Sequence, residues 1–475
     1  MVVNENTNFR DAISTVEQSG ARVWLYPKKP RGPYYSWRKV VAAVLVTFLF
    51  AAPIIHINGR QFILLNVVER KFHIFGQPFW PQDFHLLVLL MIIGVVFVSL
   101  FTVAYGRLFC GWVCPQTVFL EMLFRPIEYW IEGDRNAQKR LNKQPWNREK
   151  IIKKGVKWIL YFLMSLLISA VFMSYVMGSK EVFLHLKTPL DYPKTTLFLL
   201  IFSSVFYFVF AWFREQVCII ACPYGRLQGV LLDSDSVVVA YDHVRGEKVK
   251  GRGKINRKED REASGKGDCI DCKLCVDVCP TGIDIRNGTQ LECVNCTACL
   301  DACNEVMEKI DFPTHLIRYT SLRQIKQRNR NRWTTRLKAY TVLLSMLLGL
   351  FVFLVMSRSD IETGLFRIPG QLYTLNNETN SIQNVFTFKI VNKTTHSIDS
   401  LHFVLLNQSK GSIYTVNKRS TLRIKAEEIL DGTVFIELSK EAWLGKPQKL
   451  RVGVYHKEKL LDKADVRFTG PRTYK

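Results

Sequence analysis

The sequence of this 475-residue chain predicts a multi-spanning α-helical membrane protein with about five transmembrane helices, a small cysteine-rich domain and a C-terminal all-β sandwich. Three observations lead to this prediction. Five apolar segments are long enough to cross a hydrocarbon core, and eight of the twelve cysteines form two closely spaced runs. The segment 358–475 alternates apolar and polar side chains over short stretches, which is typical of strands.

The apolar segments are nearly uncharged on all sides, which suits lipid surroundings better than the core of a soluble domain. A helix of about 20 residues spans a hydrocarbon core. The segments are 40–57, 84–104, 158–177, 195–213 and 339–356. The first has the basic flank of a signal peptide, but Pro53 and His56 follow it where small residues would mark a cleavage site. We therefore predict a retained membrane anchor.

Lysine and arginine are unevenly distributed between the loops. They are frequent before the first segment, between the second and third, and around the cysteine runs, whereas 58–83 and 178–194 hold few. Positive loops stay in the cytoplasm, so the N-terminus and the cysteine runs are predicted there, with 358–475 on the far side. The net charge of +24 lies beside apolar runs. We interpret these basic residues as determinants of membrane topology and as contacts to anionic membrane lipids, not as a nucleic-acid binding surface.

These patterns divide the chain into five predicted parts. They are a cytoplasmic N-terminal segment (1–36), a four-helix membrane core (37–230), a cytoplasmic linker and cysteine-rich domain (231–338, with the cysteine runs in 263–312), a fifth transmembrane helix (339–357) and a far-side immunoglobulin-like domain (358–475). Some seven short antiparallel strands are expected in the last part. Because it shows no nucleophile or metal constellation, we interpret it as a binding or stabilising module.

Two cysteine runs share the spacing C-x2-C-x2-C-x3-C. They are Cys269, Cys272, Cys275 and Cys279, and Cys293, Cys296, Cys299 and Cys303. In two-cluster ferredoxins this spacing gives three ligands to one [4Fe–4S] cluster and the fourth to the other. We therefore predict a cytoplasmic two-cluster ferredoxin-like domain that transfers single electrons. One cluster takes Cys269, Cys272, Cys275 and Cys303, and the second takes Cys293, Cys296, Cys299 and Cys279.

Zinc and disulfides are the alternatives for these runs. Zinc ribbons use two separated C-x2-C pairs, and a reducing cytosol disfavours disulfides. Haem and nucleotide cofactors are not expected. Histidine is sparse, with nine residues and none in the middle of the third, fourth or fifth apolar segment, and no G-x-G-x-x-G motif occurs.

The other four cysteines form a duplicated C-x3-C-P motif at the cytoplasmic membrane edge. They are Cys110 and Cys114, followed by Pro115, and Cys218 and Cys222, followed by Pro223. On a helix each pair shares one face, and we expect the two motifs to face each other. Two thiolate pairs can bind a soft metal such as Cu(I) or form a reversible disulfide. Arg107 and Arg214 are expected to lower the thiol pKa.

Simple helix packing is the alternative role for these four cysteines, because a free cysteine packs like a small apolar residue. One C-x3-C motif alone favours packing. Two copies, each with the same proline and at the same membrane depth, favour redox or metal chemistry.

The chain resembles the CcoG family, also called FixG or RdxA, whose members are accessory proteins for cbb3-type cytochrome c oxidase. The resemblance covers nearly the whole chain. Its motifs include Arg107-x2-Cys110-Gly-Trp-x-Cys114-Pro-Gln116, Cys218-x3-Cys222-Pro-Tyr-Gly-Arg226, Cys279-Pro-Thr-Gly-Ile-Asp284 and Arg367-x-Pro-Gly-Gln-Leu-Tyr373. Asn304 stands where two-cluster ferredoxins have a proline after the last cysteine. Proline is not a ligand, so the cluster prediction is unaffected.

The resemblance implies a place in the bacterial cytoplasmic (inner) membrane, with the tail domain periplasmic. It also implies reduction of Cu(II) to Cu(I), which supplies the haem–copper centre of the oxidase. Cys110, Cys114, Cys218 and Cys222 would then be the copper or redox-relay site, and the eight ferredoxin-type cysteines the electron path. The implied partners are copper-transport and cbb3 oxidase assembly proteins, with a cytoplasmic electron donor that the sequence does not name.

Two other functions fit the same sequence features. One is a quinol-linked electron-transfer subunit similar to NapH and NosR proteins, which share membrane C-x3-C-P motifs and ferredoxin parts. The other is a non-enzymatic scaffold for oxidase assembly, in which the tail domain holds the oxidase subunits.

Overall fold

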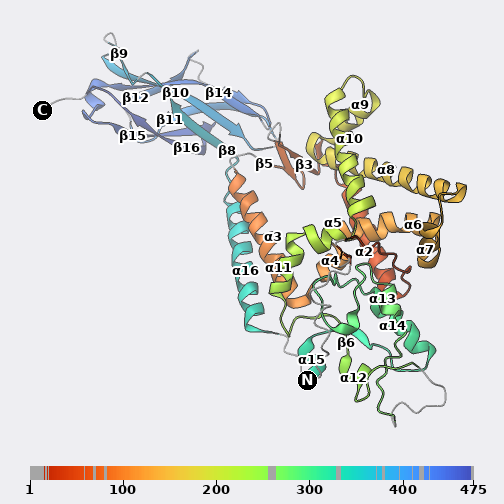
Figure 1. Ribbon diagram of the computed structural model, residues 1–475. Coiled ribbons are helices and arrows are strands. Elements are labelled where there is room, and N and C mark those ends of the chain that lie inside the picture. Colours follow the sequence, from red (N-terminus) through yellow and green to blue (C-terminus); the bar gives the residue numbers. More distant parts are fainter. Residues whose placement is uncertain are drawn as a thin grey trace. The chain divides into compact units, whose positions relative to one another are not determined.

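A computed structural model describes most of the chain (Figure 1). The described residues are 15–16, 19, 21–57, 59–67, 71–79, 83–254, 264–327, 333–370, 372–376, 380–394, 396–408, 410–416, 422–426 and 428–471. The chain divides into two compact units. One comprises Met1–Asn66 and Leu87–Gly349, and the other comprises Val67–Leu86 and Leu350–Lys475.

Five helices in the described part of the chain are long and apolar enough to cross a membrane, which is the number that the sequence predicts. They are α2 (Pro33–Ala51), α3 (Phe84–Tyr105), α8 (Arg148–Met177), α10 with its π-helical end η3 (Pro193–Phe208 and Val209–Phe213) and α16 (Thr335–Met356). Their large apolar side chains are mostly exposed, and α16 buries none of its residues. Such surfaces are stable against lipid tails and costly in water.

The first of these helices begins and ends earlier than the predicted segment 40–57. Pro33 at the first helical position has the φ angle that a helix needs, and Gly32 before it has a φ of 140°. Pro53 has no N–H to continue the helical ladder, so α2 stops at Ala51. His56 and Ile57 then pair with Gln61 and Arg60 in a short β-hairpin.

The rest of the first unit consists of short elements. They are β1 (His56–Ile57), β2 (Arg60–Gln61), β3 (Ile63–Asn66), α4 (Leu108–Trp112), α5 (Pro115–Val118), η2 (Phe119–Phe124), α6 (Arg125–Ile131), α7 (Arg135–Lys143), α9 (Ser179–Lys187), η4 (Val217–Ala221), α11 (Pro223–Leu231), β6 (Val238–Tyr241), α12 (His243–Glu247), α13 (Leu274–Asp277), η5 (Ile285–Asn287), α14 (Ala298–Lys309), β7 (Ile317–Thr320) and α15 (Leu322–Gln327).

Strands β6 and β7 form an antiparallel ribbon in the cysteine-rich domain. Val238 pairs with Thr320, and Tyr241 pairs with Ile317. Val239, Tyr241 and Ile317 are buried in one apolar cluster with Cys269 and Cys275. The two segments that flank the cysteine runs in the sequence therefore contribute part of the core around them.

Buried charges lie where α10 ends. Arg214 directs both terminal nitrogens at Glu128, each 2.9 Å from a carboxylate oxygen, and both residues are almost fully buried. Burial alone raises the pKa of Glu128, but the charges of Arg214, Lys157 and Arg125 outweigh it and lower that pKa to about 2. Arg214 also has a φ of 51°, unusual for a residue with a side chain. The bidentate pair therefore holds the turn from which the second C-x3-C-P motif starts.

Most of the second unit is a β-sandwich (teal to blue in Figure 1), as predicted, and the strands β4 and β5 of this unit lie in a separate sheet. Its elements are β4 (Lys71–Ile74), β5 (Gln77–Phe79), β8 (Ile361–Arg367), β9 (Thr374–Asn376), β10 (Ser381–Asn392), β11 (Ile398–Leu405), β12 (Gly411–Thr415), β13 (Leu422–Ile424), β14 (Ile429–Ser439), η6 (Lys440–Ala442), β15 (Gln448–His456) and β16 (Lys459–Phe468). One sheet has the order β12-β14-β10-β8, with β9 also on β10, and the other has the order β13-β11-β15-β16.

The alternation of side chains along these strands builds the core between the sheets. Phe386, Phe388 and Ile390 of β10 point inward, as do Val452 and Val454 of β15. The described part of the sandwich has nine strands where the sequence predicts some seven. The two extra strands, β9 and β13, have only three residues each, too few to show a period of two.

Asp83 holds the segment Val67–Leu86 to the sandwich within this unit. Its carboxylate lies 2.7 Å from Arg358 and 2.7 Å from Lys393, and it is only 3% exposed. We expect Asp83→Ala to destabilise the sandwich by about 2 kcal/mol, because the half-buried Arg358 loses this carboxylate and the buried Lys393 keeps only that of Glu362. Proteolysis of the full-length protein in a urea series measures this change.

An exposed ion pair of the same unit gives the control. Asp399→Ala removes the partner of Arg423, and both side chains are more than half exposed. This variant is expected to lose less than about 1 kcal/mol. Equal losses in the two variants would show that the buried Asp83 contacts stabilise nothing.

Candidate iron–sulfur and thiol sites

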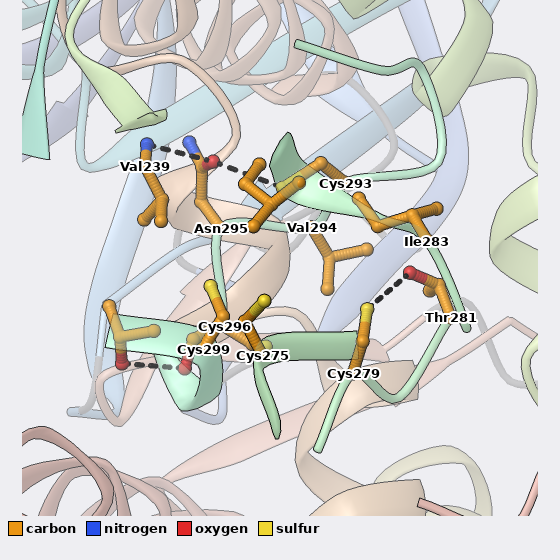
Figure 2. Close-up of a pocket in the computed structure, with 12 residues that line it drawn as sticks. Val239, Cys275, Cys279, Thr281, Ile283, Cys293, Val294, Asn295, Cys296 and Cys299 are labelled. Carbon is orange, nitrogen blue, oxygen red and sulfur yellow. Dashed lines mark hydrogen bonds between the residues drawn. The ribbon is translucent and has the colours of Figure 1, made fainter. Parts of the chain in front are cut away.

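One enclosed cavity of the cysteine-rich domain is lined by the second cysteine run together with Cys279. The lining residues include Cys275, Cys279, Cys293, Cys296 and Cys299, with Val239, Ile283 and Val294 as apolar walls (Figure 2). Cys279 comes from the first run and lies across the cavity from the loop that carries the second. The structure thus brings together the four cysteines predicted for the second cluster.

A second cavity is lined by the cysteines predicted for the first cluster. They are Cys269, Cys272, Cys275 and Cys303, with Tyr241, Met307 and Leu316 among the other walls. Cys303 lies in α14, which carries the last two cysteines of the second run, so each run sends its fourth cysteine to the other cavity. Cys275 lines both cavities. The two sites therefore adjoin at Cys275, which suits electron exchange between them.

The backbone of the two runs repeats the same unusual conformation. Asp271 and Lys273, on either side of Cys272, have φ angles of 53° and 59°. Asn295 and Thr297, on either side of Cys296, have φ angles of 54° and 65°. Two left-handed residues in each loop wrap the chain tightly, so three successive cysteines point to one cavity.

The donor set fits an iron–sulfur cluster better than a single metal ion. Among the described residues, no three His, Cys, Asp or Glu side chains are close enough to hold one ion, and this applies to the ferredoxin-type cysteines and to the four cysteines of the C-x3-C-P motifs alike. Four thiols round an enclosed apolar cavity instead match a four-iron cubane, whose ligands are spread farther apart. Burial raises the pKa of Cys275, Cys293 and Cys303 to about 12. These thiols become thiolates at neutral pH when metal replaces the proton.

The C-x3-C-P motifs are not continuous helices, so the prediction that each pair shares one helix face is wrong. Cys110 lies in α4, but Cys114 is extended, with φ −57° and ψ 125°, and precedes α5. Cys218 lies in the π-helical turn η4, and Cys222 is extended before α11. Pro115 and Pro223 cause the break, because each starts a new helix and cannot donate to the preceding one.

The two motifs nevertheless face each other, as predicted. Cys218 is close enough to Cys110, Cys114 and Cys222 for their charges to raise its pKa.

The expected lowering of the thiol pKa by arginine is wrong. Burial raises the pKa of Cys218 to about 12 and that of Cys110 to about 11. The charge of Arg107 lowers the pKa of Cys110, but by less than burial raises it. Arg214 is occupied by Glu128 instead.

Three polar side chains to which the sequence analysis gave no role form a chain of hydrogen bonds that begins at the Cys110 thiol. The Cys110 thiol donates to the amide oxygen of Gln228 at 3.3 Å, and Gln228 is fully buried. The Gln228 amide donates in turn to Thr102 at 3.4 Å, whose hydroxyl lies 2.7 Å from that of Tyr224. Only the position of Tyr224 and Gln228 soon after Cys222 could have indicated them.

The first C-x3-C-P motif packs directly on the loop that carries the second cysteine run. Cys110 contacts the apolar cluster of Val294 and Cys296. Arg38 donates to the Gly111 carbonyl at 3.1 Å, and Arg107 donates to the carbonyls of Leu291 and Gly225. Arg107 thus joins both motifs to this loop. The four-thiol site is therefore next to the second cluster cavity.

Gly111 is required for this contact. A Cβ there would lie 2.8 Å from the Asn295 carbonyl oxygen and closer still to that of Val294. We expect Gly111→Ala to push the motif off the loop and to slow electron transfer to the thiol site at least about tenfold. The rate of cluster reoxidation by Cu(II) measures the change, with iron content as the test of intact clusters.

Gly155→Ala is the matched control for this prediction. Gly155 lies in α8, and a Cβ there meets nothing within 4 Å. It is expected to leave the rate unchanged. An unchanged rate in Gly111→Ala as well would mean that the contact with the loop plays no part in electron transfer.

Family comparisons agree with this arrangement. A family described as a 4Fe-4S dicluster domain matches residues 213–322, which include the second C-x3-C-P motif and both cysteine runs. A 4Fe-4S binding domain matches residues 84–137, which include the first motif. A family described as an IG-like fold at the C-terminus of FixG matches residues 351–471. With five candidate spans, these matches identify a membrane electron-transfer protein with two [4Fe–4S] clusters.

Three relatives cover much of the chain. Protein RdxB of Cereibacter sphaeroides is 34% identical over 88% of this chain and 89% of its own length. Protein RdxA of the same organism is 36% identical over 63% of each chain. The nitrogen fixation protein FixG of Rhizobium meliloti is 35% identical over 63% of this chain and 57% of its own length. The chain therefore belongs to the FixG/RdxA family.

Proposed function

We propose that the chain reduces Cu(II) to Cu(I) at the four-thiol site, in the bacterial cytoplasmic membrane, for assembly of a cbb3-type oxidase. The N-terminus and both clusters face the cytoplasm in this proposal, and the sandwich faces the periplasm. One observation carries the proposal. The site built from Cys110, Cys114, Cys218 and Cys222 packs against the cavity of the second cysteine run.

The cysteines that line the two cavities hold the clusters in this proposal. Cys269, Cys272, Cys275 and Cys303 hold one, and Cys293, Cys296, Cys299 and Cys279 hold the other. Bound clusters of this kind accept and release one electron each. Cys275, in the wall between the cavities, brings the two groups close together.

The thiol site suits copper as a substrate. The two thiolates of one C-x3-C pair are enough to bind Cu(I), so the site needs no third close ligand. Soft sulfur ligands favour Cu(I) over Cu(II), and they therefore make the reduction more favourable. With the pKa of Cys110 and Cys218 raised to about 11 and 12, the empty site holds protons. Copper binding releases these protons, and each Cu(II) takes up one electron to become Cu(I).

An anaerobic assay on the full-length protein in detergent tests this proposal. The protein is reduced with dithionite, excess reductant is removed, and Cu(II) is added with a chromogenic chelator that is specific for Cu(I). We expect one Cu(I) for each electron that the clusters lose, so two for a doubly reduced protein. Reoxidation of the clusters without Cu(I) would contradict the proposal and favour a different electron acceptor.

A further inference from the structure

The arrangement of the two cavities gives electron flow a direction, if the proposed reduction at the thiol site is correct. Cys110 packs against Val294 and Cys296 of the second cavity. The first cavity meets the second at Cys275, and none of its lining residues belongs to the cluster that Cys110 contacts. Electrons that leave at the thiol site are therefore received at the first cavity.

One of the four cysteines proposed to hold the cluster of the first cavity lies at the protein surface. Cys272 is exposed, whereas the other seven ferredoxin-type cysteines are buried or half-buried. Electron transfer falls steeply with distance, so a donor must approach the cluster where the protein covering is thinnest. The surface round Cys272 is where a donor can come closest.

That surface is basic. The segment 245–253 runs beside 265–269 through backbone hydrogen bonds, among them Lys250 N–H to the Gly265 carbonyl at 3.0 Å and Gly253 N–H to the Cys269 carbonyl at 3.3 Å. We call this pair of segments the basic ribbon. Four exposed lysines lie here. Two are on the ribbon, one directly follows it and one follows Cys272: Lys248, Lys250, Lys254 and Lys273.

The carboxylates nearby do not cancel this charge, because arginines already occupy them. Asp268 lies 2.6 Å from Arg245, and Glu247 lies 3.3 Å from Arg252. Asp271, beside Cys272, shares Arg286 with Asp284, so this group of three carries one net negative charge against the four lysines. Within the described part of the chain, the four exposed lysines have no carboxylate partner, so the surface that the ribbon and Lys273 form beside the first cysteine run is net positive.

We propose that a small acidic electron-carrier protein of the cytoplasm docks on the basic ribbon and Lys273 and donates electrons near Cys272. Each encounter oxidises the carrier by one electron and reduces the chain by one, with no bond or proton transferred. Opposite charges speed such encounters, and transient redox complexes need only a small interface. The lysine patch supplies the attraction, and the exposed cysteine sets the point of contact.

A membrane hydroquinone is the competing donor. A cavity of about 480 Å³ lies beside the cytoplasmic end of α3, lined by Phe101, Tyr105, Asp235 and Val237. Val237 is two residues from Val239, which lines the second cluster cavity. A hydroquinone there would feed the second cluster directly and leave the first outside the path. The observations therefore favour the soluble donor.

The test uses the full-length protein with both clusters, without copper, so it does not depend on copper reduction. A reduced acidic ferredoxin or flavodoxin is the probe, and cluster bleaching in a stopped-flow instrument gives the rate. Lys248→Glu/Lys250→Glu/Lys273→Glu is expected to lower this rate at least about tenfold at low salt. The rate of the unaltered protein should fall with rising salt, while that of the variant should not.

Binding provides a second readout. Calorimetry should show that the acidic carrier binds the unaltered protein and that the lysine variant has lost this affinity. Lys446→Glu/Lys457→Glu/Lys459→Glu, on exposed lysines of the sandwich, changes the net charge equally and is the control. It should behave like the unaltered protein. Equal rates in all three proteins would overturn the proposal, and so would reduction of the clusters by a water-soluble hydroquinone but by neither carrier.

Discussion

Replacing one cysteine of each membrane-edge motif, in Cys110→Ser/Cys218→Ser, is expected to abolish Cu(I) formation. One thiol remains in each motif, Cys114 and Cys222, so both C-x3-C pairs are broken and the four-thiol site is lost. We expect the rate of Cu(I) formation to fall by a factor on the order of 100 or more. Neither residue lines a cluster cavity, so iron content and reduction by dithionite should not change.

Val113→Ser/Ile219→Ser is the control for this double variant. Both residues lie inside the same C-x3-C stretches and carry no thiol. Unchanged Cu(I) formation is expected, because polarity is added without removing a ligand. If the cysteine variant also made Cu(I) at the original rate, copper would be reduced elsewhere. The four thiols would then be helix-packing residues. Such a result would favour the assembly-scaffold function or the quinol-linked electron-transfer function over copper reduction.

The second large effect concerns the exchange of fourth ligands between the two cysteine runs. Cys303→Ala should remove the cluster held by Cys269, Cys272 and Cys275, although Cys303 belongs to the other run. Cys279→Ala should remove the cluster held by Cys293, Cys296 and Cys299. Each variant is expected to keep about half of the iron, because one four-iron cluster remains of two. Iron analysis and electron paramagnetic resonance measure the loss.

Double variants distinguish the crossed arrangement from an uncrossed one. Cys303→Ala/Cys272→Ala removes two ligands of one cavity and should keep about half of the iron. Cys303→Ala/Cys296→Ala removes one ligand from each cavity and should keep almost none. The reverse result, with iron retained in the second pair and lost in the first, would show that each run ligates its own cluster.

Most of the fold follows from local sequence patterns. Five uncharged apolar stretches of helical length predict five membrane helices, and the structure has five candidate spans. Alternation of apolar side chains predicts the sandwich, which is formed by two four-strand paths. The boundaries were less predictable. The short apolar run at β6 became part of the cluster-domain core only by pairing with β7, a long way along the chain.

The C-x3-C-P motifs show where local reasoning fails. Helical spacing alone places both thiols of a pair on one face, but a proline directly after the second cysteine starts a new helix and leaves that cysteine extended. The arginine before each motif suggests a lowered thiol pKa. Burial outweighs the charge of Arg107, and Glu128 occupies Arg214. Neither burial nor the identity of an ion-pair partner can be read from neighbouring residues.

The sequence by itself determined which chemistry the chain carries, because ligand type and spacing are local properties. Eight cysteines at ferredoxin spacing and two C-x3-C-P motifs are visible without any structure. Only the tertiary structure decided how these groups are connected. It placed Cys110 against the second cluster cavity, Cys275 between the two cavities and Cys272 at the surface. These are contacts between distant segments, fixed by burial and by close backbone approach at Gly111, and no local pattern contains them.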